Sequence, residues 1–351
     1  MNNNSYCMSS YLFFKYIYGE KYDFDHVTPH RNYVGPVDSD RIPVKSAIEI
    51  NEAIEKQLEA FNCNSVGVFL SGGMDSAIVA SYFPGADAYT FRYPGINYPS
   101  DELVRAERFA QFYGLKLHYV DITLETMLLH LEELMRAKSS PVYYIEPQLH
   151  QAALQAKADG KEIIMVGEGS DLVFGGMGWL LSKDWKLEDF MKTIMSTNPN
   201  EVIRDAYPMD WVFEQYRVGD DGIDYIKYID EIFTCDAYTS YDNAFSVAGI
   251  PYFDPFEKLK MSIPLDLNRI RSGEPKYLVR ELFQMRYPGI PTPEKIRLPN
   301  PLDAFLKDWT GPTRREFLPA LDLSKFKGKN KWQILCLEKF LNMLDADSAG
   351  A

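Results

Sequence analysis

The stretch from residue 66 to residue 82 constrains the fold of this chain more than any other. An apolar run, residues 66–70, leads into a turn with two consecutive glycines, Gly72 and Gly73, and a segment with helical character opens at Asp75. Two glycines let the backbone turn tightly and present its N–H groups to an anion. The N-terminus of the following helix adds a partial positive charge at the same place. The stretch therefore predicts a strand, an anion-binding turn and a helix in succession.

The side chains of the turn indicate which anion it binds. Ser71 and Ser76 add hydroxyl donors beside the two glycines. Asp75 would repel a phosphate unless a cation lay between them, and hard carboxylate oxygens suit Mg²⁺. We therefore predict that Ser71, Gly72, Gly73 and Ser76 bind the phosphates of ATP, and that Asp75 binds Mg²⁺.

Two commoner nucleotide motifs do not account for this turn. No stretch of the sequence supplies the Walker A pattern G-x-x-x-x-G-K-[ST]. The dinucleotide fingerprint G-x-G-x-x-G also fails, because Leu172 stands where the third glycine after Gly167 and Gly169 would be. The pattern S-G-G-x-D-S instead resembles the loop of the ATP pyrophosphatases. That resemblance implies cleavage of ATP between the α and β phosphates, with transfer of AMP to a substrate oxygen.

Predicted strands alternate with predicted helices through the first half of the chain. Strands are expected at residues 65–70, 88–91, 116–120 and 163–166, and helices at 46–61, 75–82, 101–113, 123–137 and 149–158. This alternation is typical of βαβ units and predicts an α/β fold with a parallel sheet. Ligands in such sheets bind at the carboxyl ends of the strands. The glycine-rich loops that follow Leu70 and Val166 are therefore expected to converge on one crevice.

The rest of the chain divides into two further parts. Residues 1–46 are expected to be an irregular N-terminal segment that precedes an α/β core at 47–180. The part at 181–351 is expected to be mostly helical and to complete the same domain, because the strand signal fades there. Its predicted helices lie at residues 187–196, 223–233, 277–286 and 331–344.

A second glycine-rich motif follows the strand that ends near Val166. Residues 167–176 read G-E-G-S-D-L-V-F-G-G and resemble the G-E-G-S-D-E-V-F-G-G segment of asparagine synthetases and their lactam-forming relatives, within the synthetase domain. Three more segments match that family in order: residues 249–254 are similar to R-V-P-F-L-D, 276–280 to K-x-x-L-R, and 293–295 to the lysine loop. The resemblance covers roughly residues 50–310. It implies a sheet of the ATP-pyrophosphatase type, which is adenine nucleotide α-hydrolase-like.

The resemblance implies a role for each charged residue of these motifs. Asp75 and Asp171 follow neighbouring strands and would hold Mg²⁺ between the ATP phosphates. Lys295 would neutralise the charge that develops on the α-phosphate, and Lys276 would also lie on the phosphate side. Glu168, between two glycines at the crevice, is expected to contact the substrate or the incoming amine.

The resemblance also places the rest of the nucleotide. Adenine would be held by the main chain around Leu70 and Phe91, and Val166 and Gly167 would lie near the ribose or the purine. Main-chain contacts of this kind leave little trace in the choice of side chains, so these four positions depend on the resemblance alone.

The acceptor pocket is expected to include Tyr143, Tyr144 and Glu146, together with Gly169 and Ser170. In the lactam-forming relatives a Tyr–Glu pair deprotonates the attacking amine, and a phenol beside a carboxylate could act here as a general base in the same way. A packed aromatic turn is the alternative interpretation of residues 143–146.

The chain departs from the asparagine-forming members of the family at several positions. Asn2 stands where their glutaminase domain has a nucleophilic cysteine, so we expect a lone synthetase domain that takes nitrogen from ammonia, a separate glutaminase or an amine. Gly249 replaces the arginine before V-P-F, and Leu172 replaces the acidic residue after G-E-G-S-D. An aspartate substrate needs a cation for its α-carboxylate and an anion for its amine. Those groups are not at the expected positions, so we expect a product other than asparagine.

These observations favour an ATP-dependent ligase that adenylates a small-molecule carboxylate and forms an amide. One alternative is a nucleotide-binding subunit that is active only with a separate glutaminase or carrier protein. Another is a tRNA-modifying or sulfur-transfer ATP pyrophosphatase, which the net charge of −13 disfavours because the overall field repels polyanions.

Cysteine usage and hydropathy bear on where the protein works. The four cysteines form no C-x-x-C pair and are expected to be free thiols in a reducing compartment. No apolar run is long enough to span a bilayer, and residues 1–18 lack the pattern of a signal peptide. We therefore expect a cytoplasmic protein with no nucleic-acid or membrane partner.

Overall fold

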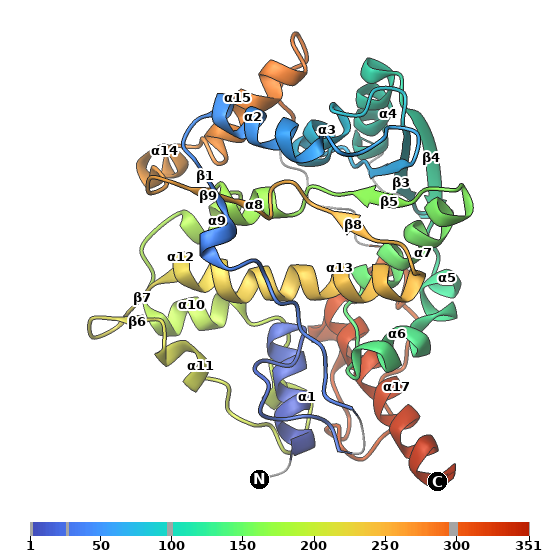
Figure 1. The fold of residues 1–351 in the computed structure, drawn as a ribbon. Coiled ribbons are helices and arrows are strands. Elements are labelled where there is room, and N and C mark those ends of the chain that lie inside the picture. Colours follow the sequence, from blue (N-terminus) through green and yellow to red (C-terminus); the bar gives the residue numbers. More distant parts are fainter. Residues whose placement is uncertain (1–2, 26–27, 97–100, 295–300, 351) are drawn as a thin grey trace.

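A five-stranded sheet lies at the centre of the computed structural model, which describes residues 3–25, 28–96, 101–294 and 301–350 (Figure 1). Its order is β4-β3-β2-β5-β8, and every neighbouring pair is parallel. The strands are β2 (Val66–Phe69), β3 (Asp87–Arg92), β4 (Lys116–Asp121), β5 (Ile163–Met165) and β8 (Tyr252–Phe253). The predicted α/β fold with a parallel sheet is confirmed.

Helices cover both faces of this sheet, as the crossovers of a parallel sheet require. In Figure 1, α2 (Ala47–Leu58), α3 (Met74–Ala80) and α15 (Tyr277–Arg286) lie above the sheet. The helices α7 (Ile145–Ala158) and α13 (Thr234–Ala248) lie below it and pack along each other. The loops that leave β2 and β5 therefore meet between the two helical layers.

The predicted helices of the core are present with small changes. The helix α4 (Asp101–Tyr113) has the predicted bounds, whereas the helix expected at 123–137 is divided at His130 into α5 (Leu124–Leu129) and α6 (Leu131–Lys138). The remaining short helices are α8 (Gly169–Val173), α9 (Gly178–Leu181), α11 (Trp211–Glu214), α14 (Leu267–Arg271) and α16 (Leu302–Phe305), with 3-10 turns at Asp38–Asp40, Pro199–Glu201 and Leu323–Lys325.

The N-terminal segment is irregular over the described residues of 15–37, but its first part is not. That first part forms the helix α1 (Asn3–Phe14), whose residues from Ser5 to Phe14 are all buried. A helix that is buried on every side shows no apolar stripe, which is why its sequence gave no helical pattern. Further along, β1 (Ile42–Val44) pairs in parallel with β9 (Leu259–Met261), so the segment is tied to the second half of the chain.

The second half contains helices at three of the four predicted places, with one correction and one omission. The helices α10 (Leu187–Ile194) and α17 (Gly328–Gly350) match predicted ones, but residues 223–233 do not form one helix. Ile223 is the last residue of a hairpin formed by β6 (Arg217–Val218) and β7 (Gly222–Ile223). The chain then continues as α12 (Tyr225–Tyr228) and a π-helical turn (Ile229–Phe233). The sequence of α13 is rich in Ser, Thr, Tyr and Asp, which are weak helix formers, so only its packing reveals it.

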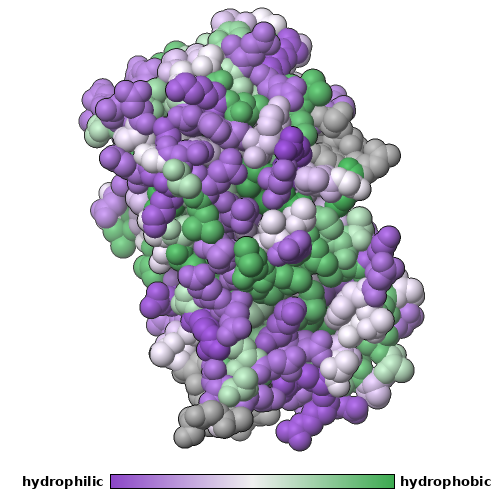
Figure 2. Space-filling model, turned by 90° about the vertical axis from the view of Figure 1, so that its right-hand side faces the viewer, coloured by the Kyte–Doolittle hydropathy of each residue, from purple (hydrophilic) through white to green (hydrophobic). Residues whose placement is uncertain are grey.

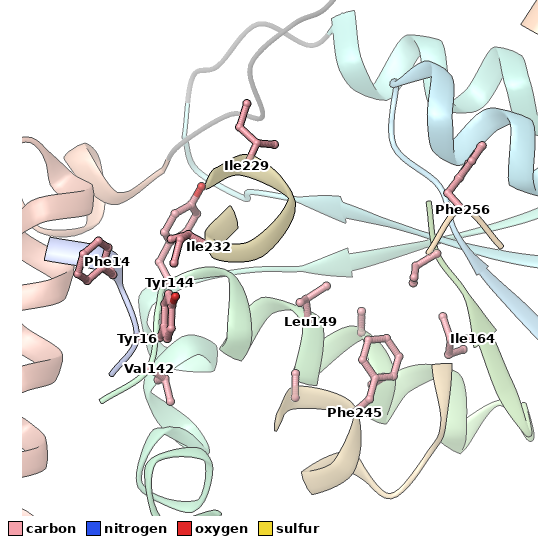
Figure 3. Packing of buried hydrophobic residues seen from close by; sticks show 14 of the residues in the cluster. Phe14, Tyr16, Val142, Tyr144, Leu149, Ile164, Ile229, Ile232, Phe245 and Phe256 are labelled. Atoms are coloured by element: carbon pink, nitrogen blue, oxygen red, sulfur yellow. The ribbon is translucent and has the colours of Figure 1, made fainter. Parts of the chain in front are cut away.

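One cluster of buried hydrophobic residues joins all parts of the described chain. Figure 3 shows members from the end of α1, from the segment 142–149, from β5 and from the π-helical turn through α13. The face in Figure 2 is largely hydrophilic, with a patch of hydrophobic residues near its middle. Among the described residues, no helix combines the length and the apolar character needed to cross a bilayer.

Candidate active site

The loop after β2 is held by its own two serines. The Ser71 amide donates to Ser76 Oγ at 3.0 Å, the Gly73 amide donates to Ser71 Oγ at 3.1 Å, and the two hydroxyl oxygens lie 3.0 Å apart. Gly72 is required by packing, since a Cβ there would lie 2.5 Å from the carbonyl oxygen of Glu102 at the start of α4. The turn is therefore preformed, with its shape fixed before any anion arrives.

The loop after β5 touches the first loop directly. A Cβ on Gly167 would lie 3.1 Å from the carbonyl group of Asp75, so glycine permits the close approach. Ser170, in α8, donates its hydroxyl to Asp75 Oδ1 at 2.7 Å. The predicted convergence of the two glycine-rich loops is confirmed.

A lysine lies between the two candidate metal ligands. Lys276, the residue before α15, places its Nζ 2.6 Å from Asp75 Oδ2 and 2.5 Å from Asp171 Oδ1. Its backbone is left-handed, with φ of 56°, and the residue is only 5% exposed. Burial opposes the charge of Lys276, but the carboxylates of Asp75 and Asp171 outweigh it and raise the pKa of the ammonium group. Lys276 is therefore charged and joins the two loops.

The geometry of these two carboxylates fits a magnesium ion. Both converge on one cation already, and Mg²⁺ in nucleotide sites commonly takes one or two carboxylates, with substrate phosphates supplying other ligands. In the described part of the chain, no group of three or more His, Cys, Asp or Glu side chains forms a metal site by itself. A metal at Asp75 and Asp171 would therefore need the nucleotide.

Gly176 provides a test of this geometry, because a Cβ there would lie 1.8 Å from Asp171 Oδ1 and 2.2 Å from Lys276 Cε. We expect Gly176→Ala to displace both side chains and to lower turnover by about 10²-fold, in line with the loss of one electrostatic group in an active site. Gly178→Ala is the matched control, since its Cβ would meet only Pro275, at 3.4 Å. The two variants are compared by AMP release and by urea unfolding. Equal activity in both would contradict the assignment.

Glu168 lies at the junction of the two glycine-rich loops and has a partner that the sequence did not indicate. The Tyr241 hydroxyl, from α13, donates to Glu168 Oε2 at 3.0 Å. Burial, aided by the charge of Asp171, raises the pKa of Glu168 to about 7. Tyr241 was missed because α13 itself was missed, and no local pattern links a tyrosine to a glutamate so distant in sequence.

A second buried carboxylate supports the loop from below. Asp254 Oδ2 accepts hydrogen bonds from the Gly169 amide and from the Tyr238 hydroxyl, each at 2.8 Å. Burial raises the pKa of Asp254 to about 6. Asp254 therefore positions the backbone of the G-E-G-S-D segment, and its place at the end of the 249–254 segment was the only sequence signal for this role.

The three acceptor-pocket candidates have different surroundings. Glu146 faces the core: its Oε1 accepts from Lys138 Nζ at 2.5 Å and from the Tyr143 amide at 3.0 Å. Lys138 and Glu146 side chains are 2% and 0% exposed. Burial raises the pKa of Tyr144 to about 12, with the charge of Lys15 opposing the rise and the charge of Glu168 adding to it.

The remaining predicted positions line the strand ends. The amides of Leu70 and Val166 donate to the carbonyl groups of Tyr89 and Phe253, which continues the sheet to the start of each loop. Phe91 lies in β3 with its ring centroid 6.4 Å from that of Phe69. Lys295 lies outside the described residues, so its predicted contact with the α-phosphate stays a prediction.

The family comparison agrees with this arrangement. Residues 47–219 match the family model described as asparagine synthase. Asparagine synthetase B (glutamine-hydrolyzing) of Escherichia coli strain K12 is 26% identical over 159 residues, a match that covers 36% of this chain and 26% of that protein. The chain thus carries an asparagine synthase family domain at residues 47–219, and the match spans about a quarter of its curated relative.

Two solved structures show weaker likenesses. The NH3-dependent NAD synthetase of Campylobacter jejuni, in complex with nitrate, is 16% identical and has a TM-score of 0.25, over 37% of this chain and 58% of that one. The U34-tRNA thiolase NcsA of Methanococcus maripaludis, with its 4Fe-4S cluster, is 16% identical and has a TM-score of 0.28, over 62% of this chain and 81% of that one. TM-scores this low carry no argument about this chain.

Proposed function

We propose that this protein is an ATP-dependent ligase that adenylates a substrate carboxylate and then forms an amide with ammonia or an amine. The observation that carries the proposal is the junction of the two glycine-rich loops. There the ammonium group of Lys276 bridges Asp75 and Asp171. This places one fixed positive charge and two carboxylates beside a turn that is shaped for phosphates.

Each group has a role in the first half-reaction. A carboxylate oxygen of the substrate attacks the α-phosphorus of ATP, a phosphorus–oxygen bond forms, and the bond to the β-phosphate breaks to release pyrophosphate. The turn at residues 71–76 binds the phosphates, and Lys276 stabilises the negative charge that builds on them. Asp75 and Asp171 would hold Mg²⁺, which when bound neutralises the polyphosphate. Lys295 is proposed to contact the α-phosphate.

The second half-reaction needs a base, and we propose Glu168 for this role. The amine nitrogen attacks the acyl carbon, its proton passes to Glu168, and AMP leaves with the electrons of the acyl–oxygen bond. A carboxylate with a pKa of about 7 is ionised in half of the molecules at neutral pH and still accepts a proton readily. Tyr241 holds the carboxylate in place through its hydrogen bond of 3.0 Å.

The pKa of Glu168 predicts a pH dependence for amide formation. Because the raised pKa leaves Glu168 protonated at low pH, the rate should rise with pH through about 7 and then level off. In Glu168→Gln the amide-forming rate should fall by about 10²- to 10³-fold and lose this inflection, while pyrophosphate exchange persists. Asp254, whose pKa is raised to about 6, could give a similar inflection. The pH–rate profile of Glu168→Gln is therefore needed to assign the inflection to Glu168. An unchanged inflection in Glu168→Gln would assign it to another group.

The same pKa makes a prediction for stability. The folded protein holds the proton of Glu168 more tightly than the unfolded chain does. Between about pH 4.5 and about pH 7, Glu168 is therefore ionised in the unfolded chain but still protonated in the folded protein. The free energy of unfolding should fall as the pH rises through this range. Urea unfolding at several pH values should show this slope reduced in Glu168→Gln.

The reaction itself is tested by product analysis. The protein is incubated with Mg²⁺, ATP, ammonium and a panel of amino acids and other carboxylic acids, and AMP is separated from ADP. AMP and pyrophosphate that depend on one acid would support the ligase. Release of ADP would contradict it, because ATP would then be cleaved between the β and γ phosphates. ATP binding without AMP for any acid would favour a subunit that needs a separate glutaminase or carrier.

A further inference from the structure

An ion pair joins the N-terminal segment to the start of α13. Lys15 Nζ is hydrogen-bonded to Asp236 Oδ2, and the two side chains are 21% and 13% exposed. The ammonium group lies 5.0 Å from the ring centroid of Tyr143 and 5.9 Å from that of Phe233. Two charges and two aromatic rings are thus gathered where solvent still has access.

The backbone of Lys15 is strained. Its φ is 74°, and its amide donates to the Tyr11 carbonyl at 2.8 Å, so it ends α1 in a left-handed conformation that glycine usually adopts. This conformation is unfavourable for a residue that carries a side chain. Lys276, in the candidate active site, is left-handed as well. Strain of this kind is concentrated at functional sites, where it aims a side chain.

One face of α13 leads from this ion pair to Glu168. Phe233, Ala237 and Tyr241 are spaced four residues apart and so share a face, and all three are only partly buried. At the end of this face, Tyr241 bonds to Glu168. From Asp236 to Tyr241 the helix rises by about 8 Å, which is the length of a short aliphatic chain.

Tyr144 lies beside the ring that the Lys15 ammonium group faces. Burial raises the pKa of Tyr144, the charge of Lys15 opposes that rise, and the charges of Glu168 and Asp236 add to it. Tyr144 neighbours Tyr143, whose ring centroid is 4.6 Å from its own.

We propose that Lys15 and Asp236 bind the amino-acid head group of the acyl substrate, Lys15 its carboxylate and Asp236 its ammonium group. This inference builds on the proposed function, because the substrate's other carboxylate would be the one that is adenylated near Lys276. The segment 1–46 and α13 would then supply the cation and the anion that the family's usual positions lack.

The pairing of the two side chains explains why such a head group would be selected. In the free protein each charge neutralises the other, so neither is left alone in a partly buried place. A zwitterionic head group replaces one ion pair with two. A substrate with only one of the charges would separate the pair and leave a protein charge without a partner, which is costly.

The test uses three acids with the same spacer between the carboxylate to be adenylated and the carbon that carries the head group. L-aminoadipate carries both charges of the head group, adipate lacks the ammonium group, and δ-aminovalerate lacks the second carboxylate. Their binding is measured by calorimetry with a non-hydrolysable ATP analogue and Mg²⁺, and repeated with L-glutamate, glutarate and γ-aminobutyrate. We expect the zwitterionic acid to bind at least about 10-fold more tightly than either analogue, as one charge-assisted hydrogen bond would give.

The variants separate the two halves of the head group. Lys15→Met should lose the preference over δ-aminovalerate, and Asp236→Asn should lose the preference over adipate. The double variant Lys15→Met with Asp236→Asn removes both charges at once and should lose both preferences. Lys186→Met, which breaks an exposed pair with Asp221, is the control and should keep both.

Two results would overturn the inference: equal binding of the three acids by the unaltered protein in both series, or unchanged preferences in the double variant Lys15→Met with Asp236→Asn. AMP formation is recorded separately. A preference for the zwitterionic acid without AMP formation would contradict the proposed ligase but support the head-group site. AMP formation with simple acids and no such preference would support the ligase but contradict the head-group site.

Discussion

Replacement of Asp75 by asparagine is expected to abolish AMP formation, with a loss of about 10³-fold or more, while the fold survives. Asp75 contributes one of the two negative charges that converge on Lys276 Nζ, at 2.6 Å, and it is one of the two proposed Mg²⁺ ligands. Asparagine has the same size, and its side-chain oxygen can still accept the hydrogen bond from Ser170. Lys276 keeps Asp171 as a partner, at 2.5 Å. The variant therefore removes a charge and little else.

The measurement is AMP and pyrophosphate release over a range of Mg²⁺ concentrations, beside urea unfolding. Asp221→Asn is the matched control, because Asp221 forms an exposed ion pair with Lys186 and lies outside the candidate site. The control should keep full activity. Turnover retained by Asp75→Asn would show that Asp75 binds neither the metal nor the phosphates.

Replacement of Lys138 by methionine is expected to cause the largest loss of stability, about 3–5 kcal/mol in the free energy of unfolding. Lys138 and Glu146 form a buried pair at 2.5 Å, with exposures of 2% and 0%. Methionine would leave the Glu146 carboxylate buried with only neutral donors: the Tyr143 amide and the Asn243 amide group, each at 3.0 Å, and the Ser240 hydroxyl at 3.4 Å. An uncompensated buried charge is far more costly than a missing pair.

Urea unfolding of three variants resolves this prediction. The double variant Lys138→Met with Glu146→Gln removes both charges and should recover part of the lost stability. Lys192→Met breaks an exposed pair with Glu188 and should cost at most about 0.5 kcal/mol. Equal losses for Lys138→Met and Lys192→Met would contradict the prediction. Full ligase activity in the double variant would show that Glu146 supports the fold rather than the acceptor pocket.

The features that could be predicted from sequence are those encoded within a few residues. The helix at 101–113 has its predicted bounds, and each glycine-rich turn follows its strand, because local periodicity and glycine pairs carry that information. The meeting of the two loops could also be inferred, since strand ends in a parallel sheet share one edge.

The features that escaped prediction depend on residues far apart in the chain. Lys15 and Asp236 are separated by 221 positions, and nothing near either one indicates the other. Tyr241 belongs to a helix that weak helix formers conceal, and Glu146 looks like a surface carboxylate until its buried partner Lys138 is known. Composition and spacing cannot report such pairs, because tertiary packing alone brings them together.

The close approaches at Gly72, Gly167 and Gly176 mean that these motif glycines serve the protein's own packing, whatever ligand the loops hold. A side chain at any of them would press on Glu102, on Asp75, or on Asp171 and Lys276. Selection to keep the fold would thus preserve all three even in a descendant that had lost its chemistry. These glycines therefore indicate the fold of the two loops. Whether such a descendant is active would depend on Asp75, Glu168 and the neighbouring hydroxyl groups.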